Sequence, residues 1–161
     1  MIEKAVQILK QAESLFVLSG AGVSAESGVP TFRGANGLWK NYSATDLATP
    51  EAFQRDPELV WEWYHWRQSL ISKAQPNPAH YAIVELERRS TKFLLLTQNV
   101  DNLHQRAGSQ NVLELHGNIF RTRCTRCGTI AEPKRSKSSK GRHCEEGSDE
   151  AIRSEGSSRT K

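Results

Sequence analysis

The sequence predicts an α/β fold with an open parallel β-sheet. Short apolar runs at residues 15–18, 92–97 and 111–115 alternate with longer segments whose apolar residues recur at helical spacing. Each run continues directly into glycine or polar residues. Strands of an open parallel sheet do this, because ligands bind outside their carboxyl ends.

The helices follow from spacing and from proline. Ile2, Val6 and Leu9 recur three or four residues apart and predict a first helix before the first strand. A loop rich in glycine and proline should follow that strand. Residues 57–74 then predict a long helix, which we expect Pro76 and Pro78 to end. A further helix is expected over residues 80–89, before the last two strands.

The composition divides the chain near residue 132. Residues 133–161 hold only three apolar residues, Cys144, Ala151 and Ile152, so we expect a disordered polar tail after a folded domain at 1–132. The tail carries +3 of the net charge of +4. The basic pI of about 9.1 is therefore weak evidence for a nucleic-acid partner, and no specific one is expected.

The chain should be cytoplasmic and should have no membrane partner. No apolar run approaches the roughly 18 residues that indicate a membrane span, and residues 1–4 lack the features of a signal peptide. A single C-x-x-C pair and one further cysteine suit metal ligation in a reducing compartment better than a disulfide framework.

A glycine turn follows the first predicted strand. Residues 20–25 satisfy the pattern G-x-G-x-x-A, in which glycines let backbone amides approach a pyrophosphate. An ordinary dinucleotide-binding helix would run for several turns after this pattern. Here Gly28 and Pro30 should stop it after about two turns at most.

Four motifs together resemble the sirtuins, the NAD-dependent protein deacylases. Residues 20–34 (GAGVSAESGVPTFRG) resemble that family's cofactor loop, and residues 97–108 (TQNVDNLHQRAG) resemble its second signature. His116, followed by glycine, matches its catalytic histidine, and Cys124 with Cys127 matches the first half of its zinc site. Four motifs in the family's order argue against coincidence.

The resemblance covers residues 1–132 and implies a fold. It implies a Rossmann-like parallel sheet, incomplete at the C-terminus, with a small helical and zinc-ribbon module. The family's second cysteine pair, its remaining strands and a Gly-Thr-Ser motif do not follow here. We therefore expect a truncated or frameshifted copy.

The resemblance also implies a reaction and the residues for it. The carbonyl oxygen of an acylated protein lysine would attack the nicotinamide ribose of NAD, nicotinamide would leave, and His116 would be the base. Asn99 is the second implied catalytic residue. The implied cofactor-binding residues are Gly20, Ala21, Gly22, Ser24, Ala25, Phe32, Arg33, Trp39, Gln98, Asn99, Asp101 and His116.

Structural alternatives remain open for these residues. His116 could be an ordinary histidine at a strand end, and Arg33 could be a solvated loop charge. Asn99 or Asp101 could cap the helix before Leu103, and Asp101 could cap and bind ligand at once. His104 is expected to be structural.

Tyr64 and Arg67 form a candidate carboxylate receptor. They lie at i and i+3 on one predicted helix face, and a phenol beside a guanidinium binds carboxylates well. The alternative is an aromatic core stripe with Arg67 reaching out to solvent. The spacing resembles the Tyr-x-x-Arg motif of the sirtuin branch that removes succinyl and malonyl groups, and the small residue Ala48 matches that branch as well. Deacetylation should be weaker.

The resemblance implies a zinc site, but the sequence supplies only half of its ligands. Structural zinc needs four ligands, and after Cys124 and Cys127 only Cys144 remains, with Gly147 where its partner would stand. His143 is adjacent to Cys144 and so a poor substitute. A half-formed site is expected.

Two other function classes stay open. The chain could be a catalytically inactive sirtuin fragment. Less favoured is a zinc-dependent nucleic-acid binder that uses Arg121, Arg123, Arg126 and the basic tail. The oligomeric state is not predicted.

Overall fold

A computed structural model describes residues 2–30, 40 and 42–131 of the chain. Its centre is a parallel sheet of three strands in the order β1 (Ser14–Ser19), β2 (Lys92–Thr97) and β3 (Val112–Glu114). The predicted open parallel α/β sheet is confirmed. Hydrogen bonds from Leu95 N to Asn111 O and from Leu115 N to Thr97 O flank β3, so the pairing reaches both ends of the predicted segment.

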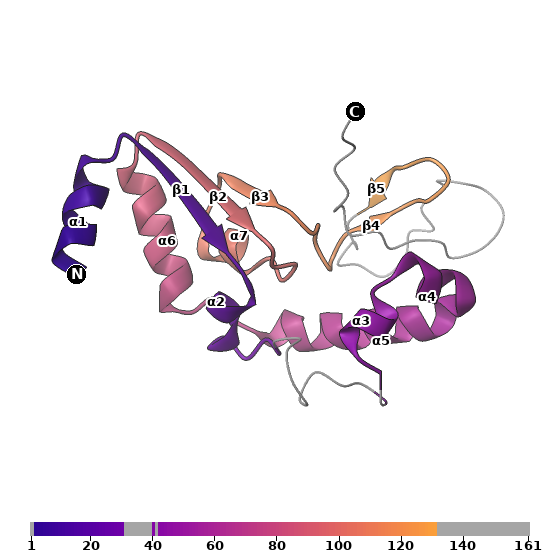
Figure 1. Ribbon diagram of the computed structural model, residues 1–161. Helices are drawn as coiled ribbons and strands as arrows, with labels where there is room; N and C mark the ends of the chain where they lie inside the picture. The colour runs from indigo at the N-terminus through magenta and orange to yellow at the C-terminus, as the bar shows by residue number, and fades with distance from the viewer. Residues whose placement is uncertain (1, 31–39, 41, 132–161) are drawn as a thin grey trace.

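One face of the sheet is covered by helix α6 (Pro78–Arg89), as Figure 1 shows. Leu95 on this face is fully buried and Val84 of α6 is 4% exposed. Side chains that alternate with these point to the other face. There Leu18 is 59% exposed and Leu113 is 51% exposed. The strands are apolar on both faces, but the described residues cover only one of them.

Helix α1 (Ile2–Gln11) precedes β1 and lies at the amino end of the strand (Figure 1). Its apolar positions match the predicted stripe, but none of its residues is buried. No described helix is both long enough and apolar enough to cross a membrane.

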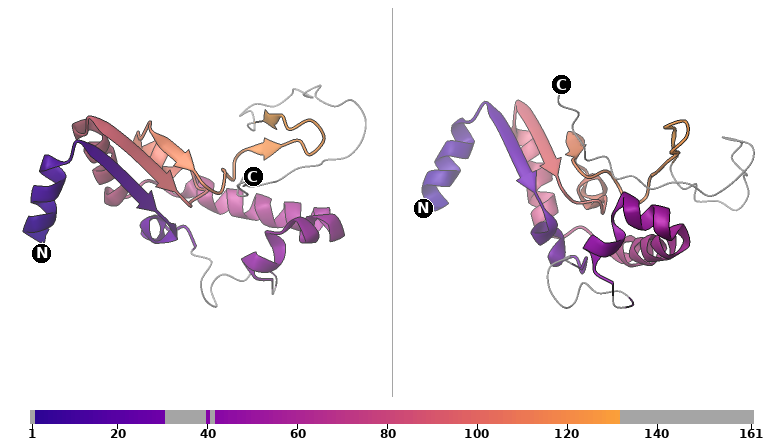
Figure 2. Two further views of the ribbon diagram at one scale, coloured as in Figure 1. Left: turned by 45° about the horizontal axis from the view of Figure 1, so that its top comes forward. Right: turned by 45° about the vertical axis from the view of Figure 1, so that its right-hand side comes forward.

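A helical unit lies at the carboxyl ends of the strands (Figure 2). It consists of α3 (Ala44–Leu47), α4 (Pro50–Arg55) and α5 (Pro57–Lys73). Leu47 and Trp63 form its core. Each helix begins at a side-chain cap, at Ser43, Thr49 and Asp56, which explains why adjacent helices break where they do.

The predicted helix ends need one correction. Helix α5 ends at Lys73, close to the expected residue 74, and Ala74 is already extended before Pro76. Pro78 does not end a helix: it occupies the first turn of α6, after the cap Asn77. Helix α6 therefore begins two residues before the predicted residue 80, because proline is well tolerated at the first helical position.

The chain then leaves the sheet for a small hairpin. Strands β4 (Thr122–Arg123) and β5 (Ile130–Ala131) pair antiparallel and enclose Cys124 and Cys127. The predicted tail at 133–161 lies outside the described residues.

Candidate functional site

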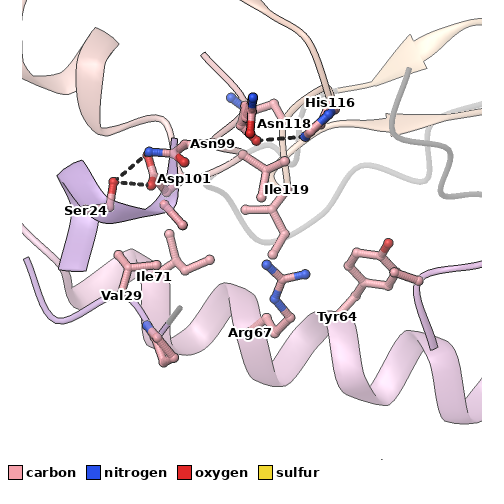
Figure 3. Close-up of a pocket in the computed structure, with 15 residues that line it drawn as sticks. Ser24, Val29, Tyr64, Arg67, Ile71, Asn99, Asp101, His116, Asn118 and Ile119 are labelled. Atoms are coloured by element: carbon pink, nitrogen blue, oxygen red, sulfur yellow. Dashed lines mark hydrogen bonds between the residues drawn. The ribbon is translucent and has the colours of Figure 1, made fainter. Parts of the chain in front are cut away.

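A cavity of about 330 Å³ lies at the carboxyl edge of the sheet, between the turn after β1 and helix α5 (Figure 3). Nine residues expected in the site line it: Ala21, Ser24, Ala48, Tyr64, Arg67, Gln98, Asn99, Asp101 and His116. Segments from five parts of the sequence thus converge on one cavity. This is the edge at which the sequence predicted ligand binding.

The glycine turn forms one wall of the site. Gly20 is the N-cap of α2 (Ala21–Ala25), and this short helix is followed by Gly28 at φ +80° and then by Pro30, as predicted. Among the described residues, a Cβ placed on Gly22 would meet no atom within 4 Å outside its own helical turn. Packing therefore gives no reason for glycine at 22, which fits a backbone kept open to an incoming group such as a phosphate.

Ser24 and Asp101 join this turn to the segment after β2. The Ser24 hydroxyl donates to Asp101 Oδ2 at 2.7 Å, and Asp101 Oδ1 accepts the Leu103 N–H at 3.0 Å. Ser24 is 1% exposed and Asp101 4%. Asp101 thus accepts the backbone N–H of the first residue of α7 (Leu103–Ala107), whose N-cap is Asn102, and holds the glycine turn with the same carboxylate.

Asn99 offers its carbonyl oxygen to the cavity. Its amide nitrogen donates to Gly20 O and to Ser24 Oγ, both at 3.0 Å. These two bonds use both amide hydrogens. What remains for a ligand is the acceptor Oδ1, which suits a hydroxyl donor such as a ribose hydroxyl.

His116 lies in the loop after β3, and a hydrogen bond defines which of its ring nitrogens carries the proton in the neutral ring. Its Nδ1 is 3.1 Å from the carbonyl oxygen of Gln98. A carbonyl can only accept, so in the neutral ring Nδ1 carries the proton and Nε2 holds the lone pair. The ring is exposed and lines the cavity, so Nε2 is an accessible base.

Glu114 holds the loop after β3 in place. Its carboxylate accepts from Gln105 and Asn118, each at 2.7 Å, and forms an ion pair with Arg121. The carboxylate side chain is only 10% exposed. Because Arg121 is already paired with Glu114, this ion pair argues against the interpretation that Arg121 contacts nucleic acid.

Tyr64 and Arg67 rise from α5 toward His116 (Figure 3). Burial lowers the pKa of Arg67 to about 10, although the neighbouring Tyr64 counteracts this, and burial raises the pKa of Tyr64. At neutral pH the pair is therefore a cation beside a neutral phenol. Arg67 is 8% exposed and lies 4.8 Å from the Trp63 ring centroid, so the alternative in which it reaches out to solvent is wrong.

Several cavity residues were not predicted: Val29, Pro30, Ile71, Val100, Asn118 and Ile119. Ile71 could have been found, because it lies one turn after Arg67 on the same helix face. Val29, Pro30 and Val100 lie within the two motifs that resemble the family but were not named as site residues, whereas Asn118 and Ile119 carried no local signal. Of the expected cofactor residues, Gly20, Gly22 and Ala25 flank the cavity, whereas Phe32, Arg33 and Trp39 lie outside the described residues.

The described residues do not complete a zinc site. Cys124 and Cys127 lie in the turn of the β4–β5 hairpin, and no group of three histidine, cysteine or acidic side chains suited to a metal occurs within 2–30, 40 and 42–131. Structural zinc requires four ligands. The hairpin supplies two of them, so these residues do not fit a closed zinc site, and the predicted zinc-ribbon module is not shown.

Comparison with protein families matches residues 20–154 to the Sir2 family. An NAD-dependent protein deacylase from Thermus thermophilus is 60% identical over 131 residues, which cover 79% of this chain and 52% of that protein. One from Thermococcus kodakarensis is 59% identical over 127 residues, covering 79% and 49%.

Solved structures agree with this result. A crystal structure of a Sir2 homolog–NAD complex is 53% identical, with a TM-score of 0.76 over 81% of this chain and 51% of that one. A Sir2 mutant with a peptide and NAD is 32% identical, with a TM-score of 0.70 over 83% and 52%. The chain spans about half the length of the curated relatives it matches. On the family match, the identities and the shared fold, the chain belongs to the Sir2 family.

Proposed function

We propose that this chain carries the NAD-binding and acyl-lysine-binding face of an NAD-dependent protein deacylase. One observation carries the proposal: a single cavity gathers His116, Asn99 and Asp101 beside a glycine turn at the carboxyl edge of a parallel sheet. Relatives at about 60% identity are named NAD-dependent protein deacylase, and a related structure is an NAD complex.

The chain's own groups have separate tasks in this proposal. Bound NAD would supply a ribose carbon from which nicotinamide can depart. Asn99 Oδ1 would accept a hydrogen bond from a ribose hydroxyl, and Ser24 with Asp101 holds the glycine turn in place. His116 Nε2 would take a proton from a ribose hydroxyl, because its Nδ1 is held by the Gln98 carbonyl and Nε2 keeps the lone pair.

The acyl group on lysine is proposed to be acidic, with succinyl and malonyl preferred to acetyl. Arg67 is a buried cation in the cavity wall and Tyr64 a neutral donor beside it. A carboxylate bound there gains a charge-assisted hydrogen bond that an acetyl group cannot make. The small Ala48 side chain leaves room for the longer chain.

Mass spectrometry tests the proposal. The purified chain is incubated with NAD and with succinyl-, malonyl- or acetyl-lysyl peptides of one sequence, and O-acyl-ADP-ribose is measured. A chimaera that adds the unmatched second half of the Thermus thermophilus relative is assayed in parallel, and His116→Ala is the negative control.

The outcomes separate the candidate functions. Product from the chain alone would mean that the described cavity suffices. Product from the chimaera only would favour the second candidate, an inactive fragment with a correctly arranged half-site. No product from either, or product unaffected by His116→Ala, would refute the deacylase proposal.

A further inference from the structure

Two buried histidines lie in contact behind the cavity. His80 of α6 is fully buried and His104 of α7 is 1% exposed, with ring centroids 4.9 Å apart. Neither ring lines the cavity. Each has one nitrogen with a hydrogen-bond partner and one with none among the described residues, namely His80 Nε2 and His104 Nδ1. Unpaired buried nitrogens are costly, so both need an explanation.

The proton of His80 can be assigned from its one partner. The backbone N–H of Asn77 donates to His80 Nδ1 at 3.2 Å. Nδ1 therefore carries no proton. In the neutral ring the proton is on Nε2, and the unpartnered nitrogen of His80 is a donor.

The proton of His104 follows from Ser19. The Ser19 hydroxyl donates its one hydrogen to Thr97 Oγ1 at 2.9 Å, and its oxygen lies 2.8 Å from His104 Nε2. Ser19 must then accept from His104, so the His104 proton is on Nε2 and its unpartnered Nδ1 is an acceptor. The opposite tautomer of His104 would set two donors against each other on touching rings.

The chain of hydrogen bonds ends at the cavity. Thr97 Oγ1, which accepts from Ser19, also accepts the backbone N–H of Asn99 at 3.1 Å. We propose that His104 is a positioning residue for Asn99: with His80 it forms a neutral pair of fixed tautomers that holds the cavity's ribose-facing acceptor through Ser19 and Thr97. The ribose contact rests on the proposed function, but the proton arrangement does not.

The electrostatics of the pair support this arrangement. Burial lowers the pKa of His104 to about 4, the neighbouring His80 lowers it further, and Asp101 opposes both effects. Burial likewise lowers the pKa of His80, again opposed by Asp101. Both rings are neutral at neutral pH. One donor and one acceptor then remain on two rings in contact, without a direct hydrogen bond between them, and a single buried water bonded to both would satisfy them.

The first test is NMR of the ligand-free chain. Long-range ¹H–¹⁵N spectra of ¹⁵N-histidine protein distinguish the two neutral tautomers at each ring. We expect both His80 and His104 to carry the proton on Nε2 at pH 7. A His104 protonated on Nδ1, or a charged ring at that pH, would overturn the proposal.

The second test follows the Asn99 side-chain amide resonance in variants. His104→Leu removes the donor to Ser19, Ser19→Ala removes the link itself, and His104→Gln keeps a donor near the Nε2 position. We expect the first two to shift the Asn99 resonance and His104→Gln to restore it. His65→Leu, at an exposed histidine on α5, is the matched control and should leave it unmoved.

NAD titration adds a functional readout. Loss of one positioning hydrogen bond should weaken NAD binding about fivefold in His104→Leu and in Ser19→Ala, with recovery in His104→Gln. An Asn99 resonance unmoved in both variants would overturn the proposal. If the wild-type chain binds no NAD, the proposed function fails for the chain alone. The histidine tautomers and the Asn99 resonance still show whether His104 positions Asn99. If His104→Leu does not fold, Ser19→Ala and the tautomers decide it.

Discussion

The hydroxyl of Ser24 donates a 2.7 Å hydrogen bond to Oδ2 of Asp101, a residue 77 positions later in the chain. This bond joins the glycine turn after the first strand to the polar segment after the second. Both partners are almost fully buried, so the contact is protected from water. Two motifs that are separate in sequence become one site because parallel strands end at the same edge.

Ser24→Ala should destabilise the fold. The change leaves Asp101 Oδ2 and one amide hydrogen of Asn99 buried without their partner, which costs about 1–3 kcal/mol. Urea unfolding measures it. Ser72→Ala on the exposed side of α5 is the control and should change stability by less than about 0.5 kcal/mol. Equal effects of the two variants would contradict the role given to Ser24.

Arg67→Met should remove the proposed preference for acidic acyl groups. In whichever form of the protein is active, kcat/KM for the succinyl peptide should fall about 10- to 100-fold, since one charge-assisted hydrogen bond is lost. The value for the acetyl peptide should change little. Arg55→Met, at an exposed arginine of α4, is the matched control. A parallel loss with both peptides would mean that Arg67 serves the fold and not acyl choice.

Stability should fall as the pH drops from about 6.5 toward 4. The pKa of His104 is lowered to about 4 in the folded chain, against 6.5 in its ordinary range, so the unfolded state binds the proton first. The neutral ring's contribution is complete above pH 6.5. By about pH 4 roughly 3 kcal/mol is lost, and His80 acts in the same direction.

Urea midpoints of wild type and His104→Gln across this range measure the effect. The difference in pH dependence between the two proteins isolates His104. The variant should show a smaller loss on acidification, because glutamine does not titrate. Identical curves for the two proteins would show that His104 is not the titrating group.

The two faces of the sheet should respond differently to truncation. Leu95→Ala should cost about 2–5 kcal/mol, because its side chain is fully buried under α6. Leu18→Ala on the uncovered face should cost less than about 1 kcal/mol, since 59% of Leu18 is already exposed. Denaturant unfolding of both variants decides this.

The chimaera with the relative's second half extends this prediction. If the added half covers the open face, Leu18→Ala should become clearly more costly there than in the chain alone. An unchanged cost in the chimaera would mean that the face stays exposed. A large cost already in the chain alone would mean that the face is covered by residues outside 2–30, 40 and 42–131.

Much of the fold could be predicted because the signals are local. Alternation of apolar runs with helical spacing predicted the three strands, and the caps of α4 and α5 lie where Thr49 and Asp56 each stand directly before a proline. The start of α6 was predicted late, because a proline that ends one helix and a proline that opens the next look alike without their neighbours. The resemblance of their motifs to the sirtuins marked His116, Asn99 and Asp101 for the site.

Other features depend on contacts between distant residues. The tautomer of His104 follows from Ser19, which lies 85 positions earlier on strand β1. Arg67 was ambiguous in sequence, since a helix face becomes a cavity wall or a solvent face only when another element packs against it. The apolar side chains of the strands indicate burial on both faces of the sheet, because side-chain polarity shows only which positions tolerate burial. Whether a position is actually buried depends on which other segments are present to exclude water.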